Sequence, residues 1–194
     1  MSISFNPKHL IGNQYEVKVH SNDTPKDRAE MLLMLQTHIN HMVNAMAAMM
    51  GTAIRDFGVE KSMLFNEAIQ HLTKMRDDPF AIIEFIPPNV QGKQNVIAEY
   101  ADLTITYDPT KPIDAQYEMC HETYLKKPET KDEVLEVLLT DVVHITNGVV
   151  CFANRIIKDF GQNRFELYNQ MMHQLVLIRG FGLDLTKELP IFAR

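Results

Sequence analysis

Apolar residues recur at helical spacing in two long segments of this chain, about one hundred residues apart. Steps of three, four and seven positions place these residues on one face of a helix, so each segment is predicted to form a long helix that buries this face. The residues are Met31, Leu35, Met42, Met46, Met49, Ala53 and Phe57 in the first segment and Val134, Leu138, Ile145, Val149, Phe152, Ile156 and Phe160 in the second.

Start and stop signals set the limits of these helices. Asp27 and Thr130 each stand three residues before a glutamate, the spacing of a capping box, in which the two side chains satisfy each other's backbone N–H groups. Gly58 and Gly161 can adopt the left-handed conformation that ends a helix. We therefore predict helices over about 28–57 and 131–160, followed by shorter helices over about 61–76 and 164–179.

The two segments belong to an internal repeat. "ISFNPKHLIGNQYE" at 3–16 resembles "ITYDPTKPIDAQYE" at 105–118, and 25–76 aligned with 128–179 gives 15 identities in 52 positions. Chance would give only about three, which indicates a tandem duplication. The identical residues of the first copy are Pro25, Glu30, Leu32, Leu35, Thr37, His41, Asn44, Ile54, Asp56, Phe57, Gly58, Leu64, Asn66, Leu72 and Arg76.

Each copy reads as two short strands, separated by an Asn-Pro or Asp-Pro turn, and then two helices. Copy one spans 1–103 and ends in a β-hairpin over about 80–103, with a proline-rich turn at 87–94, while copy two spans 104–194. We expect one compact α+β unit, mainly α, in which the duplicated unit forms a pseudo-two-fold four-helix bundle with a small β-sheet or hairpin.

Polar residues form a stripe on another face of both long helices. Spacings of four and three place them one above the other. They are Thr37, His41 and Asn44 in copy one and Thr140, His144 and Asn147 in copy two. One interpretation is a buried hydrogen-bond network that fixes the register of the bundle. Another is a ligand site near the pseudo-two-fold axis.

A metal site is a further interpretation of the same face. His38 precedes His41 by three residues, and Asp141 precedes His144 by three. If the two faces met, these four side chains would offer nitrogen and oxygen ligands to Zn²⁺ or Fe²⁺. A cysteine–histidine nucleophile made from Cys151 and His144 is a weaker alternative, because no third orienting residue is evident.

The segment from Tyr117 to Gly161 resembles the all-α MazG-type nucleoside triphosphate pyrophosphohydrolases, whose glutamates and aspartate on facing helices hold Mg²⁺. The resemblance implies that Glu118, Glu122 and Asp141 are metal ligands. The sequence departs from the family pattern at Met119 and Leu138, where the family has glutamates. The remaining set is poor in the hard oxygen ligands that Mg²⁺ prefers.

Composition and charge exclude several classes of function. The net charge is −6 and there is no run of lysines or arginines, so nucleic acid and anionic membranes are not expected partners. No stretch approaches the roughly 20 apolar residues of a membrane-spanning helix, and no signal sequence opens the chain. The two cysteines, Cys120 and Cys151, fit a reducing compartment. We expect a cytoplasmic protein.

Common catalytic motifs such as a P-loop, GxSxG or HExxH are absent from the sequence. The leading hypothesis is a non-enzymatic interaction or regulatory protein, an adaptor, inhibitor or ligand binder, with no expected cofactor. A protein partner would meet the methionine-rich helices, the hairpin turn at 87–94 or the acidic surface, and a homo-oligomer is compatible with this. The alternatives are a divalent-metal-dependent hydrolase acting on nucleotides and a binder of a small ligand at the pseudo-two-fold axis.

Overall fold

The structure of the chain is a computed structural model. It describes residues 2–6, 8–10, 13, 15–18, 24–58, 61–78, 101–112, 115–123 and 130–181. In chain order its elements are β1 (Ser2–Phe5), β2 (Tyr15–Lys18), α1 (Arg28–Phe57), α2 (Lys61–Asp77), β3 (Ala101–Tyr107), β4 (Tyr117–Thr123), α4 (Lys131–Phe160) and α5 (Arg164–Phe181). The result is a mainly helical α+β fold that contains the four helices expected from the sequence.

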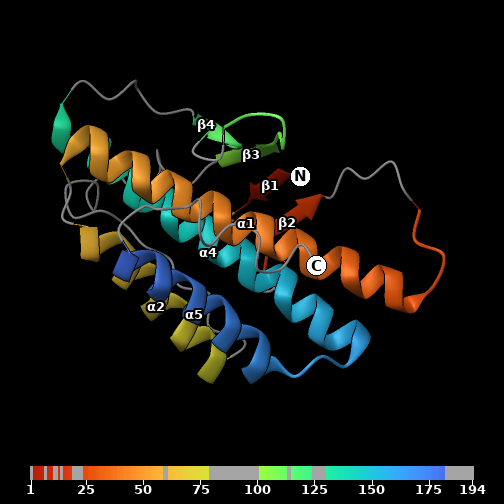
Figure 1. The fold of residues 1–194 in the computed structure, drawn as a ribbon. Coiled ribbons are helices and arrows are strands. Elements are labelled where there is room, and N and C mark those ends of the chain that lie inside the picture. Colours follow the sequence, from red (N-terminus) through yellow and green to blue (C-terminus); the bar gives the residue numbers. More distant parts are fainter. Residues whose placement is uncertain are drawn as a thin grey trace.

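The described elements form three layers. Figure 1 shows α1 and α4 side by side in the middle, the strands on one side of them, and α2 and α5 on the other. The start of α1 lies beside the end of α4, since the Arg28 guanidinium donates a hydrogen bond to the Phe160 carbonyl oxygen. The helices of each pair therefore run antiparallel: Arg76 near the end of α2 reaches Asn169 near the start of α5.

The strands form two antiparallel pairs, β1 with β2 and β3 with β4. Pairing of β1 with β3 joins them into one small sheet of order β2-β1-β3-β4. In this central ladder Ser2 faces Thr104, the residue 102 positions later, which is the offset of the sequence repeat in this region. The hairpin predicted over about 80–103 lies outside the described residues up to position 100, and 101–103 open β3.

The helix ends follow local sequence chemistry. Thr130 and Glu133 form the predicted capping box, and Gly58 and Gly161 end α1 and α4 with φ of 62° and 70°. At the start of α1 the prediction was half wrong. Asp27 accepts from the Glu30 N–H, but the Glu30 carboxylate accepts from the N–H of Lys26 rather than that of Asp27.

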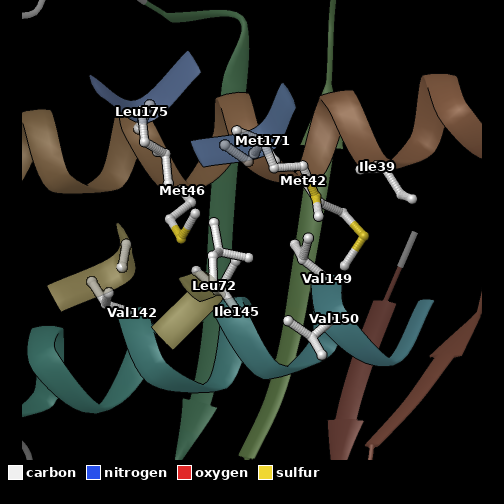
Figure 2. Packing of buried hydrophobic residues seen from close by; sticks show 14 of the residues in the cluster. Ile39, Met42, Met46, Leu72, Val142, Ile145, Val149, Val150, Met171 and Leu175 are labelled. Atoms are coloured by element: carbon white, nitrogen blue, oxygen red, sulfur yellow. The ribbon is translucent and has the colours of Figure 1, made fainter. Parts of the chain in front are cut away.

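The middle layer carries most of the core. Figure 2 shows Met42 and Met46 of α1 packed against Ile145 and Val149 of α4, with Leu72 and Met171 from the outer helices beside them. The centres of α1 and α4 are buried on nearly every side, because each has the sheet on one face and the α2–α5 layer on the other. Many methionines of the helices therefore fill the core, where a flexible side chain suits an irregular space. They are Met42, Met46, Met49, Met50, Met75 and Met171.

A close approach of the sheet to α4 occurs at Gly148. A Cβ atom at this position would lie 2.8 Å from Ile3 Cδ1 and 2.9 Å from Ile3 Cγ2, well inside van der Waals contact. Ile3 is itself buried in β1. The corresponding position of α1, 103 residues earlier, is Ala45. Glycine therefore allows β1 to settle directly on the α4 backbone.

Helix α4 is also the one candidate membrane span among the described residues, by length and composition alone. The sequence analysis expected no segment of this kind. The physical reason for the apolar character is visible in the fold, because 62% of the most apolar 18-residue window is buried against the other elements.

Substitution of a capping glycine tests whether the left-handed conformation ends the helix. Gly161→Ala should lower the free energy of unfolding by about 1–2 kcal/mol, because alanine is strained in the left-handed conformation. No atom lies within 4 Å of the new methyl group, so strain would be the only cause. Gly180→Ala is the matched control: it also meets no atom within 4 Å, but it is the penultimate residue of α5 and has no left-handed φ, so it should change stability by less than about 0.5 kcal/mol. Chemical denaturation measures both, and a stabilising Gly161→Ala would contradict the assignment.

Candidate functional site

Four side chains meet between the sheet and α4 and form what we call the Tyr15 cluster. The Tyr15 hydroxyl of β2 lies 2.9 Å from His144 Nδ1, and Asn147 Nδ2 donates to the same hydroxyl at 3.0 Å. The Phe5 ring of β1 packs on both rings, with centroids 4.6 Å from His144 and 4.8 Å from Tyr15. Phe5, Tyr15 and Asn147 are buried, so the cluster is closed to solvent apart from His144.

A second group of the same design joins the other end of the sheet to α1, and we call it the Tyr117 cluster. His41 Nδ1 lies 2.8 Å from the Tyr117 hydroxyl of β4, which also has a hydrogen bond with Asn44. The Tyr107 ring of β3 takes the place of Phe5, with centroids 4.4 Å from His41 and 5.0 Å from Tyr117. The two clusters thus have nearly the same geometry.

The contacts are reciprocal between the two parts of the chain. Tyr15 precedes Tyr117 by 102 residues, and His41 precedes His144 by 103. Each tyrosine lies on the helix of the opposite part rather than on the helix that follows it in the sequence. The outer helices repeat this exchange, because Arg76 binds Asn169 while Arg179 binds Asn66.

The hydrogen bonds of the Tyr15 cluster define a proton arrangement. The Tyr15 oxygen accepts from Asn147, so its own hydrogen is available for His144 Nδ1. A nitrogen that accepts a hydrogen bond carries no proton, and the neutral imidazole then has its hydrogen on Nε2. With the ring in this tautomer, one tyrosine hydroxyl joins Asn147 and His144.

Burial shifts the pKa values of the groups around His41. It lowers the pKa of His41, and the nearby His38, one turn earlier on α1, lowers it further. Burial lowers the pKa of His38 as well. It raises the pKa of Tyr117 to about 12, against the opposing effect of the hydrogen bond with Asn44. Both partners of the His41–Tyr117 pair therefore favour their neutral forms at neutral pH.

The two clusters differ in exposure. Tyr107 is 41% exposed, whereas its counterpart Phe5 is 5% exposed. One turn before the cluster histidine, α1 has the half-buried His38 and α4 has the buried Asp141. The Tyr117 cluster is therefore the more polar and the more open of the two.

The remaining members of the predicted polar stripes behave separately. The half-buried Thr37 donates its hydroxyl hydrogen to the Leu33 carbonyl oxygen of its own helix at 2.8 Å. Thr140 is buried in α4. The structure thus brings His41 and Asn44 together around one tyrosine, and His144 and Asn147 around another.

The predicted metal ligands do not converge. His38, His41, Asp141 and His144 all belong to the described residues, and among those residues no three His, Cys, Asp or Glu side chains form a group that could hold a metal ion. The histidines of α1 and α4 instead face two different tyrosines. The four-ligand arrangement that the sequence suggested is therefore not assembled.

The ligand set implied by the MazG-type resemblance needs a correction. Glu118 and Glu122 lie in strand β4, whereas the resemblance implies glutamates on a helix. The Glu118 carboxylate is exposed and lies 3.6 Å from Lys111 Nζ, while Asp141 is buried in α4. The cysteine–histidine alternative is also unsupported, since burial raises the pKa of the Cys151 thiol to about 11 and keeps it protonated at neutral pH.

The sequence did not predict the tyrosine partners of His41 and His144, nor two further buried polar residues in the outer helices. The sequence predicted two short strands before each pair of helices, but not the hydrogen bonds of Tyr15 and Tyr117 to the long helices. The signal was present: "QYE" and the His-x-x-Asn spacing each occur twice, about one hundred residues apart. His71 of α2 and Gln174 of α5, 103 residues apart, are also buried, and His71 Nε2 lies 3.5 Å from Glu67.

No protein-family model, curated protein or solved structure matches this chain.

Removal of the tyrosine hydroxyls tests the clusters. Tyr15→Phe should lower the free energy of unfolding by about 1–3 kcal/mol, because His144 and Asn147 lose a buried hydrogen-bond partner. Tyr117→Phe should cost less, since Tyr117 is only half-buried. Tyr107→Phe is the control, because this exposed ring has Phe as its counterpart in the other cluster, and it should change stability by less than about 0.5 kcal/mol. Equal effects of all three changes in urea denaturation would contradict the assigned bonds.

The buried histidines predict a loss of stability in acid. His38, His41 and His71 have folded-state pKa values below the ordinary 6.5, mainly because of burial. The unfolded chain therefore binds protons more readily than the folded chain. The free energy of unfolding should keep its highest value above pH 6.5 and decrease as the pH falls from 6.5 toward the lower pKa values of the folded state.

The variant His71→Gln measures how much His71 contributes to the loss of stability in acid. Its counterpart Gln174 shows that the fold accepts glutamine at the equivalent place in α5. Glu67 raises and Lys74 lowers the pKa of His71, but burial has the largest effect. The variant should reduce the slope of unfolding free energy against pH below 6.5 by up to about 1.4 kcal/mol per pH unit. An unchanged slope in denaturation series at several pH values would refute this origin.

Proposed function

We propose that this chain is a non-enzymatic interaction or regulatory protein, built from two copies of one unit related by a pseudo-two-fold axis. Support for the duplication comes from the reciprocal contacts. The Tyr15–His144 and Tyr117–His41 pairs use equivalent residues of the repeat, as do the Arg76–Asn169 and Arg179–Asn66 pairs. An axis that passes between Ser2 and Thr104 would relate them all.

One observation carries the non-enzymatic proposal: the polar groups that sequence analysis singled out are bound to each other. His41 and His144 have Nδ1 occupied by tyrosine, and the Cys151 thiol is held protonated by burial. Reactive groups in enzymes instead have pKa values near the working pH and lie where a substrate can reach them. Here the same residue types join the two copies and stabilise the fold.

The outer face of α5 supports an interaction role for the protein. Phe165, Asn169, His173 and Val176 form a stripe along this helix at spacings of four, four and three, and we call it the α5 stripe. All four are exposed, with Phe165 at 53% and Val176 at 37%. The stripe has no aspartate, glutamate, lysine or arginine, although the chain has a net charge of −6. The Arg164 guanidinium lies over the Phe165 ring, 5.2 Å from its centroid, and aromatic residues and arginine are both enriched in protein interfaces.

We propose a protein partner that binds the α5 stripe. The other partner surfaces considered in the sequence carry less weight. Many methionines of the helices are buried in the core, and the turn at 87–94 lies outside the described residues. The cytoplasmic location and the lack of nucleic-acid and membrane partners remain part of this proposal.

Comparison of three baits tests the interaction. The wild-type protein, a Phe165→Ser/Val176→Ser variant and a Gln170→Ser control would be used to capture proteins from the native source, with quantitative mass spectrometry of what is retained. A specific partner should bind the wild type and the control equally and the double variant at least about tenfold more weakly, because exposed aromatic anchors dominate interface energies. Melting curves should be alike for the three baits, since the changed side chains are exposed.

Two results would overturn the proposal. One is the absence of any protein that separates the double variant from the control. The other is turnover, by the purified wild type, of nucleoside triphosphates in the presence of Mg²⁺, Mn²⁺ or Zn²⁺, which would restore the hydrolase alternative.

A further inference from the structure

The part of the chain before residue 79 and the part after residue 100 contact each other in every layer of the fold. We call the described residues up to Asp78 the first half and those from Ala101 onward the second half. The central ladder of the sheet joins them through β1 and β3, the middle layer through α1 and α4, and the outer layer through α2 and α5. Each layer of the fold is therefore shared between the halves.

The tyrosine hydroxyl of each cluster is hydrogen-bonded to residues of the other half. The Tyr15 hydroxyl of the first half needs His144 and Asn147 of the second, and the Tyr117 hydroxyl of the second half needs His41 of the first. The Thr146 hydroxyl likewise contacts the Met46 sulfur at 3.3 Å across the middle layer. Separation of the halves would expose the whole apolar seam between α1 and α4 to water and break the hydrogen bonds that Tyr15 and Tyr117 make across it.

We propose that the surface between the halves is a complete protein–protein interface. Each half can therefore pack either on the other half of its own chain or on the opposite half of another copy of the chain. In such a half-exchanged dimer the first half of one chain packs on the second half of the other. Every contact between the halves is kept. The monomer and the dimer then differ mainly in whether the connection 79–100 holds the two halves of one chain together.

The length of this connection decides which form is populated. Twenty-two residues separate the described halves. A connection of this size gives its two ends an effective concentration on the order of mM, so the monomer should prevail at μM protein and the dimer should appear near mM. If only four connecting residues remained, the five Cα–Cα steps from Asp78 to Ala101 would span at most about 18 Å. The path from the α2–α5 layer past the middle layer to the sheet is about 20 Å, at roughly 10 Å for each layer spacing.

The test uses the intact chain with a short thiol-specific cross-linker, in a background with Cys120→Ser and Cys151→Ala. One chain carries Arg76→Cys and a differently tagged chain carries Asn169→Cys, because Arg76 Nη1 and Asn169 Oδ1 lie 3.2 Å apart across the halves. After joint refolding from denaturant at about 1 mM, a cross-linked heterodimer should form, and it should be nearly absent after refolding at about 1 μM.

A matched pair distinguishes half exchange from ordinary association. Arg76→Cys combined with Glu118→Cys places the thiols in the outer helix layer and in the sheet, on opposite sides of the middle layer, so this pair should not cross-link. Deletion of residues 81–98 should make the protein dimeric already at μM concentration by light scattering. If the shortened chain does not fold, the intact chain decides. A folded monomer after the deletion, only monomers after refolding at mM, or equal cross-linking of both pairs would overturn the proposal.

Discussion

Burial of the middle of α1 and α4 on nearly every side is the constraint on which the rest of the structure depends. A helix covered by a sheet on one face and by two helices on the other has no solvent-facing stripe at its centre, so each polar side chain there needs a partner from a neighbouring element. The sheet supplies these partners, since Tyr15 and Tyr117 reach across to the helices. The position of the small sheet is thereby fixed by hydrogen bonds as well as by packing.

Local chemistry made the helices predictable. The caps at Asp27, Thr130, Gly58 and Gly161 act within a few residues, so the sequence contains the whole interaction. The tyrosine–histidine bonds join residues 76 and 129 positions apart. Periodicity indicates which face of a helix is polar but not which strand covers it, and for this reason the clusters could not be predicted from the stripes alone.

The same distinction explains why the metal interpretation was attractive. His38-x-x-His41 and Asp141-x-x-His144 have the spacing of ligand pairs, but spacing along one helix gives no information about the angle between two helices. In this fold His41 and His144 each lie against the sheet and meet a phenolic hydroxyl. His41, His144 and Asn147 of the two polar stripes thus have their hydrogen-bond partners in the sheet.

The contact between Ile3 and Gly148 makes the two halves non-interchangeable. Two first halves brought together in the same way would set Ala45 against Ile3, where the extra methyl group would collide with a buried side chain. Two second halves would avoid this collision, because the residue 102 positions after Ile3 is also an isoleucine, Ile105, and it would meet Gly148. Shape at this single contact therefore disfavours the pairing of two first halves and leaves the pairing of unlike halves as the arrangement in which Ile3 lies on the glycine.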